Sequence, residues 1–150
     1  MKVYGFDHVG VVVNDLAAAA AFFVRLGFTA EAPMAVSGRW VDRILDLEDV
    51  QLDLIIVSAP DGSGRLELTR FRAPQAESNG ERLPANVPGY RHIAYRVDDV
   101  TAVVRHARDA GYSTKGDIVD YEGTYRLVYI EGPEGLLVEF TEDLSATNEQ

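Results

Sequence analysis

The chain has 150 residues, 47% hydrophobic and 25% charged, which is an ordinary composition for a globular protein with a buried core. Acidic residues exceed basic ones by 24 − 14 = 10, a charge that repels nucleic acid and anionic membranes at long range. Cysteine is absent, which excludes disulfides, thiolate nucleophiles and cysteine-ligated zinc. No apolar run approaches the ~20 residues of a membrane helix, and no signal-peptide pattern opens the chain. We therefore expect a cytoplasmic protein with no nucleic-acid or membrane partner.

An internal repeat organises the sequence. Residues 6–28 (FDHVGVVVNDLAAAAAFFVRLGF) align with residues 90–112 (YRHIAYRVDDVTAVVRHARDAGY) at a constant offset of 84. The identical pairs include His8/His92, Val13/Val97, Asp15/Asp99 and Gly27/Gly111. Most of the other aligned positions keep the chemical character of the residue.

The first copy is predicted to begin with an alternating apolar strand, followed by a helix that residues 14–15 cap and Gly27 ends. An insert at residues 37–47 follows and is predicted to contain a short helix. The copy closes with a hairpin at residues 57–69, because a Pro-acid-Gly turn separates two apolar strands. The second copy repeats this order and closes with a hairpin at residues 129–141. The apolar residues that fit the helix of the insert are Trp40, Val41, Ile44 and Leu45.

These elements predict a single domain over residues 1–150, built from two modules. Module one covers about 5–71 and module two about 90–143. Residues 72–89 are rich in Pro, Gly, Asn and charge and are predicted to form a linker. The polar end of the chain, 144–150, is expected to fray.

Alternation along the strands predicts where the polar side chains point. His8, Glu67, His92 and Glu139 fall on one sheet surface, opposite the residues that the helices would cover. Converging carboxylates repel each other unless a cation or a proton lies between them. A divalent metal meets that need, and imidazole and carboxylate suit zinc, nickel, cobalt, iron or manganese. The residues expected under the helices are Val9, Val11, Val13, Leu66, Leu68, Ile93, Tyr95, Val97, Val138 and Phe140.

Each candidate ligand also has an ordinary structural interpretation. Taken singly, His8 is a hydrogen-bonded histidine at a strand end, and Glu67 and Glu139 are surface acids. The four residues at matching places in two copies favour the metal site. His106 lies off the apolar stripe of its helix and is predicted to be a surface residue.

At these residues the sequence resembles the vicinal oxygen chelate superfamily, which includes glyoxalase I, methylmalonyl-CoA epimerase, bleomycin-resistance proteins and extradiol dioxygenases. The resemblance covers about residues 5–143. It rests on DHVGVVVNDL (7–16), GRLELTRF (64–71), RHIAYRVDD (91–99) and GPEGLLVEF (132–140).

The resemblance implies an α+β fold in which two tandem βαβββ modules form a curved, funnel-like mixed sheet with helices on its outer face. It also implies that His8, Glu67, His92 and Glu139 bind one divalent metal, as the two-His, two-Glu set of glyoxalase I does. Family epimerases usually have Gln where Glu67 stands, and the ring-cleaving dioxygenases use two His and one Glu on iron. Both departures favour the glyoxalase pattern.

The activity that the resemblance implies is that of a metal-dependent lyase or isomerase, which removes a proton beside a metal-chelated carbonyl of a small molecule. Glu67 and Glu139 are then the candidate bases. Arg96 is expected to bind a substrate carboxylate, and Trp40 and Arg126 to line the pocket. The alternatives are a small-molecule binding protein of the antibiotic-resistance type and a dioxygenase. We also expect a homodimer, and the sequence leaves open whether the ligands come from one chain or two.

Overall fold

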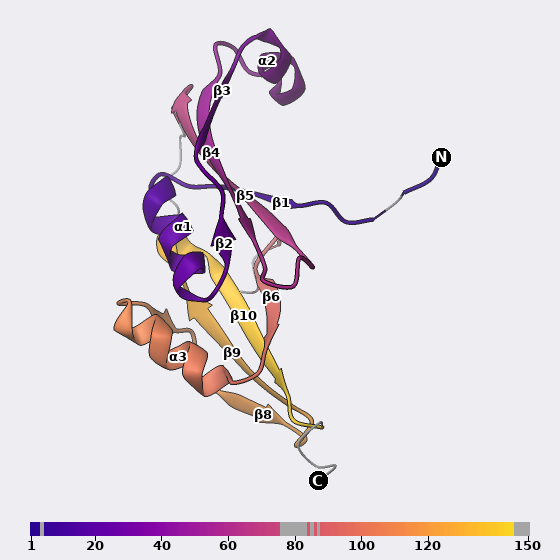
Figure 1. Ribbon diagram of the computed structural model, residues 1–150, viewed down its shortest axis with the longest axis vertical. Helices are drawn as coiled ribbons and strands as arrows, with labels where there is room; N and C mark the ends of the chain where they lie inside the picture. The colour runs from indigo at the N-terminus through magenta and orange to yellow at the C-terminus, as the bar shows by residue number, and fades with distance from the viewer. Residues whose placement is uncertain (4, 76–83, 85, 87, 146–150) are drawn as a thin grey trace. The chain divides into compact units, whose positions relative to one another are not determined.

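The structure is a computed structural model, shown in Figure 1, and it describes residues 1–3, 5–75, 84, 86 and 88–145. The chain divides into two compact units, Met1–Gly80 and Glu81–Gln150. Each unit holds one five-stranded sheet. No helix in the described residues is long and apolar enough to cross a membrane.

The first unit contains a mixed sheet in the order β1-β5-β4-β2, with β3 also paired to β4. β1 and β5 run parallel, and the other pairs are antiparallel. The helix α1 packs on β4 and β5 (Figure 1). The elements are β1 (Val9–Val12), α1 (Leu16–Arg25), β2 (Thr29–Ala30), β3 (Met34–Ser37), α2 (Arg39–Leu45), β4 (Gln51–Ser58) and β5 (Arg65–Ala73).

The second unit has the same plan. Its sheet has the order β6-β10-β9-β7, with β8 also paired to β9, and α3 packs on β9 and β10. β6 and β10 run parallel, as β1 and β5 do. The elements are β6 (Ile93–Val97), α3 (Val100–Asp109), β7 (Ser113–Thr114), β8 (Val119–Tyr121), β9 (Tyr125–Glu131), the 3-10 turn η1 (Pro133–Gly135) and β10 (Leu137–Asp143).

The two long helices follow the predicted repeat. α3 begins and ends 84 residues after α1, since 16 + 84 = 100 and 25 + 84 = 109. The side chain of Asp15 accepts a hydrogen bond from the backbone N–H of Ala18 at 2.9 Å, and Asp99 accepts one from Ala102 at the same distance. Both aspartates thereby satisfy one of the N–H groups that a helix leaves unpaired at its start.

The ends of these helices also agree with the sequence. Gly27 and Gly111 adopt φ values of +93° and +85°, a conformation that costs other L-residues free energy. The α+β fold with two tandem modules is therefore confirmed. The strand that follows each long helix is broken into two short pieces, β2 and β3 in the first unit and β7 and β8 in the second, and each piece pairs with the next long strand.

The faces of the sheets follow the predicted alternation. Leu66 and Leu68 on β5, and Val138 and Phe140 on β10, are buried on the faces that the long helices cover. Glu67 and Glu139, which have the opposite parity, are only partly buried. One face of each sheet therefore packs against the long helix, and the other carries the candidate ligands. In the first unit this second face also carries the buried residues Leu52 and Leu54.

The insert of the first unit forms the predicted short helix, α2. Val41 is its buried residue, whereas Trp40 and Ile44 are 64% and 75% exposed. β5 extends to Ala73, two residues into the segment 72–89 that was predicted as a linker. Most of that segment, and all but two residues of the predicted tail 144–150, lie outside the described residues.

Candidate functional site

In the second unit, two of the predicted ligands meet. β6 and β10 pair Ala94 with Glu139, and His92 lies two residues before Ala94, so both side chains emerge from the same face of the sheet. His92 Nε2 lies 3.2 Å from Glu139 Oε2. The side chain of Glu139 is 15% exposed and that of His92 is 41% exposed, so the pair can be reached from solvent through the histidine.

A third residue, Tyr129, completes this cluster. The hairpin pairs Tyr129 directly with Glu139, and the tyrosine hydroxyl donates a hydrogen bond to the glutamate carboxylate. The ring of Tyr129 packs edge-on against that of His92, with the ring centroids 5.3 Å apart. Burial, and then the hydrogen bond to Glu139, raise the pKa of Tyr129, so the phenol stays protonated as a donor at neutral pH.

The sequence analysis did not identify Tyr129. A tyrosine alone carries no metal-site signature, and its place opposite Glu139 depends on the pairing across the β9–β10 turn. Knowing the register of this hairpin would have identified Tyr129, because residues directly opposite each other in an antiparallel pair share a face of the sheet.

In the first unit the same register is present. β1 and β5 pair Gly10 with Glu67, and His8 lies two residues before Gly10, on the face of Glu67. Here, however, His8 Nδ1 lies 2.6 Å from a carboxylate oxygen of Asp7. Glu67 accepts a longer contact, 3.5 Å, from the hydroxyl of Thr69.

The contact with Asp7 selects the tautomer of a neutral His8 ring. Hydrogen bonds from His8 and from Arg65, the latter at 2.6 Å, lower the pKa of Asp7. Asp7 is then an ionised carboxylate, which can only accept, so Nδ1 of a neutral His8 carries the proton. The other nitrogen, Nε2, is then the one with a lone pair. Histidines that bind a metal through one ring nitrogen commonly donate a hydrogen bond from the N–H of the other nitrogen to a carboxylate.

An apolar surface borders Glu67 on its face of the sheet. Ile56 lies directly opposite Glu67 in the β4–β5 pair, and Phe71 lies opposite Leu52. Both Ile56 and Phe71 pack on a buried cluster, and α2 covers part of it through Val41. The carboxylate of Glu67 therefore lies at the edge of an apolar surface. The buried members of that cluster are Val41, Val50, Leu52 and Leu54.

The predicted substrate-binding residues fall in different places. Arg96 pairs with Thr141, two residues beyond Glu139, and so shares the face of Glu139. Trp40 lies on α2 with 64% of its surface exposed. Arg126 lies on the opposite face of the sheet from Glu139, because it pairs with Glu142. The structure thus separates Arg126 from the His92–Glu139 pair.

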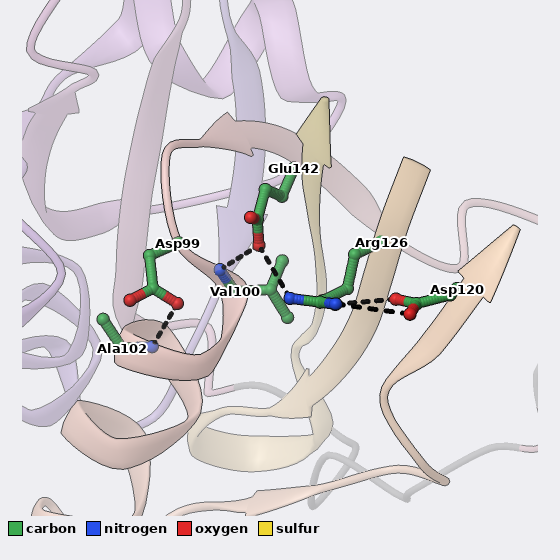
Figure 2. A network of polar contacts seen from close by, with 6 residues as sticks. All are labelled: Asp99, Val100, Ala102, Asp120, Arg126 and Glu142. Atoms are coloured by element: carbon green, nitrogen blue, oxygen red, sulfur yellow. Dashed lines mark hydrogen bonds and ion pairs between the residues drawn. The ribbon is translucent and has the colours of Figure 1, made fainter. Parts of the chain in front are cut away.

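Arg126 takes part in a polar network on the α3 side of its sheet, shown in Figure 2. Its guanidinium binds Asp120 with two hydrogen bonds of 2.6 and 3.2 Å and lies 3.9 Å from Glu142. Glu142 also accepts a hydrogen bond of 3.0 Å from the backbone N–H of Val100, at the start of α3. This network anchors the helix, which is a structural role.

Each unit therefore supplies one imidazole and one carboxylate on the polar face of its sheet. Among the described residues, no group of three or more His, Asp or Glu side chains is gathered closely enough to hold a metal. His106, the remaining histidine, is exposed on α3. The donor chemistry of His8, Glu67, His92 and Glu139, nitrogen and oxygen without sulfur, fits a divalent transition metal.

Known proteins are similar to this chain in sequence, in fold or in both. A glyoxalase family protein from Bacillus cereus is 33% identical, with 97% of each chain covered and a TM-score of 0.92. The uncharacterised protein YaeR of Escherichia coli is 27% identical over 137 residues, which are 90% of this chain and 93% of YaeR. A fosfomycin resistance protein from Listeria monocytogenes shares the fold, with a TM-score of 0.61 at 17% identity over 97% of this chain and 98% of its own.

The match to a family profile covers nearly the whole chain. The profile of the glyoxalase/bleomycin resistance protein/dioxygenase superfamily matches residues 5–140, a range that includes module one, most of module two and all four candidate ligands. The chain belongs to the glyoxalase/bleomycin resistance protein/dioxygenase superfamily.

Proposed function

We propose that the protein is a metal-dependent lyase or isomerase of the glyoxalase type, which removes a proton from the carbon beside a carbonyl group of a small molecule. The observation that carries this proposal is the repeated register of histidine and glutamate. In each unit the histidine lies two residues before the residue paired with the glutamate, on the face away from the long helix.

His8, Glu67, His92 and Glu139 are the proposed ligands of one divalent metal ion, either within one chain or in a homodimer. Their nitrogen and oxygen donors suit zinc, nickel, cobalt, iron or manganese. The hydrogen bond from His8 Nδ1 to Asp7 supports this role, because it leaves Nε2 able to bind. A bound ion of this kind supplies Lewis acidity toward a carbonyl oxygen.

In this proposal a carboxylate of the chain itself transfers the substrate proton. Glu67 or Glu139 takes it from the substrate carbon, and the same carboxylate returns it to the neighbouring carbon in an isomerisation. A positioned base of this kind contributes roughly 10²–10⁴-fold in rate. Arg96, on the face of Glu139, is the proposed partner of a negatively charged substrate group. The apolar surface beside Glu67 is the proposed apolar wall of the pocket at that carboxylate.

Metal analysis tests the ligand set. Protein loaded with each candidate metal and then freed of excess metal should retain about one ion per chain, and chelation should lower its melting temperature. His92→Ala should lose most of the metal. His106→Ala is the matched control, since His106 is an exposed histidine of the same unit and should change nothing. Equal metal content in the wild type and His92→Ala would refute the assignment.

Proton exchange tests the chemistry without knowledge of the natural substrate. Metal-loaded protein in D₂O should exchange the α-proton of at least one compound in a panel of α-hydroxycarbonyl compounds, thiohemiacetals and acyl thioesters. Glu67→Gln and Glu139→Gln should each slow the exchange, and the variant that keeps its metal but loses exchange identifies the base. Glu31→Gln and Glu122→Gln, at exposed positions in the first and second units, are the controls. The enzymatic proposal fails if no compound exchanges while the metal-free protein binds a cationic drug stoichiometrically.

A further inference from the structure

We infer that Tyr129 is a positioning residue whose hydroxyl holds the Glu139 carboxylate beside His92, so that the two His–Glu pairs of the chain are not equivalent. The inference deepens the proposed function, because it rests on Glu139 and His92 being metal ligands. In the second unit, His92 and Glu139 then form a ligand pair that the hydroxyl of Tyr129 holds in a fixed geometry.

The geometry around Glu139 supports this assignment. Tyr129 is the residue directly opposite Glu139 in the β9–β10 pair, so the two side chains leave the sheet side by side. The phenol donates to the carboxylate, and the imidazole of His92 lies 3.2 Å from one carboxylate oxygen. The phenol ring also packs against the imidazole, with an angle of 81° between the two planes. One residue thus contacts both proposed ligands.

The first unit has no counterpart to this contact in its sheet register. The residue directly opposite Glu67 is Ile56, whose aliphatic side chain cannot donate a hydrogen bond. The orienting group there is Asp7, which binds His8. In the repeat Asp7 corresponds to Arg91, because 7 + 84 = 91. The first unit therefore orients its histidine with a carboxylate, and the second orients its glutamate with a phenol.

The physical consequence concerns the freedom of the carboxylates. A free glutamate side chain samples several rotamers, and fixing it costs conformational entropy when a metal binds. The hydrogen bond from Tyr129 restricts Glu139 before any metal arrives. Groups that hold a ligand in this way typically change metal affinity by about 10–100-fold when they are removed.

Tyr129→Phe tests the inference, because it removes the hydroxyl and keeps the ring that packs on His92. Tyr121→Phe is the control, since Tyr121 is a tyrosine of the same unit with 58% of its surface exposed. Zn²⁺ affinity should be measured by competition with a chromophoric chelator. Tyr129→Phe should bind Zn²⁺ about 10–100-fold more weakly than the wild type, and Tyr121→Phe should bind it equally tightly.

Crystal structures of the metal-free wild type and of metal-free Tyr129→Phe provide the second measurement. The Glu139 carboxylate should keep its contact with His92 in the wild type and lose it in the variant. The inference is overturned if the variant keeps that contact, or if the wild type binds Zn²⁺ and the variant binds it equally tightly. If the wild type binds no metal, the proposed function fails, and the metal-free structures alone then decide the role of Tyr129.

Discussion

Replacing Glu142 with alanine should destabilise the second unit, because Glu142 is an acceptor for the start of α3. The backbone N–H of Val100 is the first of the helix and has no partner within the helix. It donates to Glu142 at 3.0 Å (Figure 2), and Val100 is fully buried. Water therefore cannot easily replace the lost acceptor.

The expected cost follows from leaving a largely buried donor without a partner. Such a loss costs about 1–3 kcal/mol in the free energy of unfolding. For a chain of this size each kcal/mol lowers the melting temperature by about 2–4 °C, so the expected decrease is roughly 2–12 °C. The loss of the contact with Arg126 adds little, because that contact is 3.9 Å long and Arg126 keeps its two hydrogen bonds to Asp120.

The repeat provides the matched control. Glu67 and Glu139 correspond at an offset of 72, and the same offset relates Glu142 to Arg70. Arg70 is exposed, so Arg70→Ala should change the free energy of unfolding by no more than about 0.5 kcal/mol. Urea denaturation should be followed by far-UV circular dichroism, because the single tryptophan, Trp40, is exposed and lies in the other unit.

Amide hydrogen exchange localises the effect. The N–H of Val100 should exchange faster in Glu142→Ala than in the wild type, and it should do so before global unfolding. The reasoning is wrong if Glu142→Ala and Arg70→Ala have the same stability within about 0.5 kcal/mol, or if exchange at Val100 does not change.

Three further predictions follow from the described contacts. Hydrogen bonding to Arg126 lowers the pKa of Asp120 below its ordinary value of 3.8, so the pair stabilises the fold above that pH and loses its effect as pH falls through the lowered pKa. Arg126→Gln should therefore lower the urea midpoint at pH 7, and the difference from the wild type should shrink below about pH 3.8; a difference that grows in acid would contradict this. Leu68→Ala should cost about 2–5 kcal/mol in urea denaturation, since Leu68 is fully buried, whereas Val12→Ala, at a 58% exposed position, should cost far less. Gly111→Ala should cost about 1–2 kcal/mol through its φ of +85° alone, because an added Cβ meets no atom within 4 Å; a neutral effect on the melting temperature would refute this.

The local chemistry of the sequence was sufficient to predict the repeat, the helices and the faces of the strands. Asp15 and Asp99 cap their helices as expected, because an N-cap bond spans only three residues and needs no distant partner. The side-chain alternation of a strand has a fixed period of two, so it could be predicted without coordinates that His8 shares the face of Glu67 and that His92 shares the face of Glu139. The metal and the reaction remain proposals.

The tertiary structure decided which side chains meet. The register of β9 against β10 places Tyr129 opposite Glu139 and places Arg126 on the other face, beside Glu142. That register depends on how the chain turns at Pro133–Gly135, where Glu134 adopts a φ of +50°, and a Pro-acid-Gly motif does not specify it. A shift of one residue in a turn moves every following side chain to the opposite face. Strand pairing, which joins residues distant in sequence, is therefore what the sequence pattern alone could not supply.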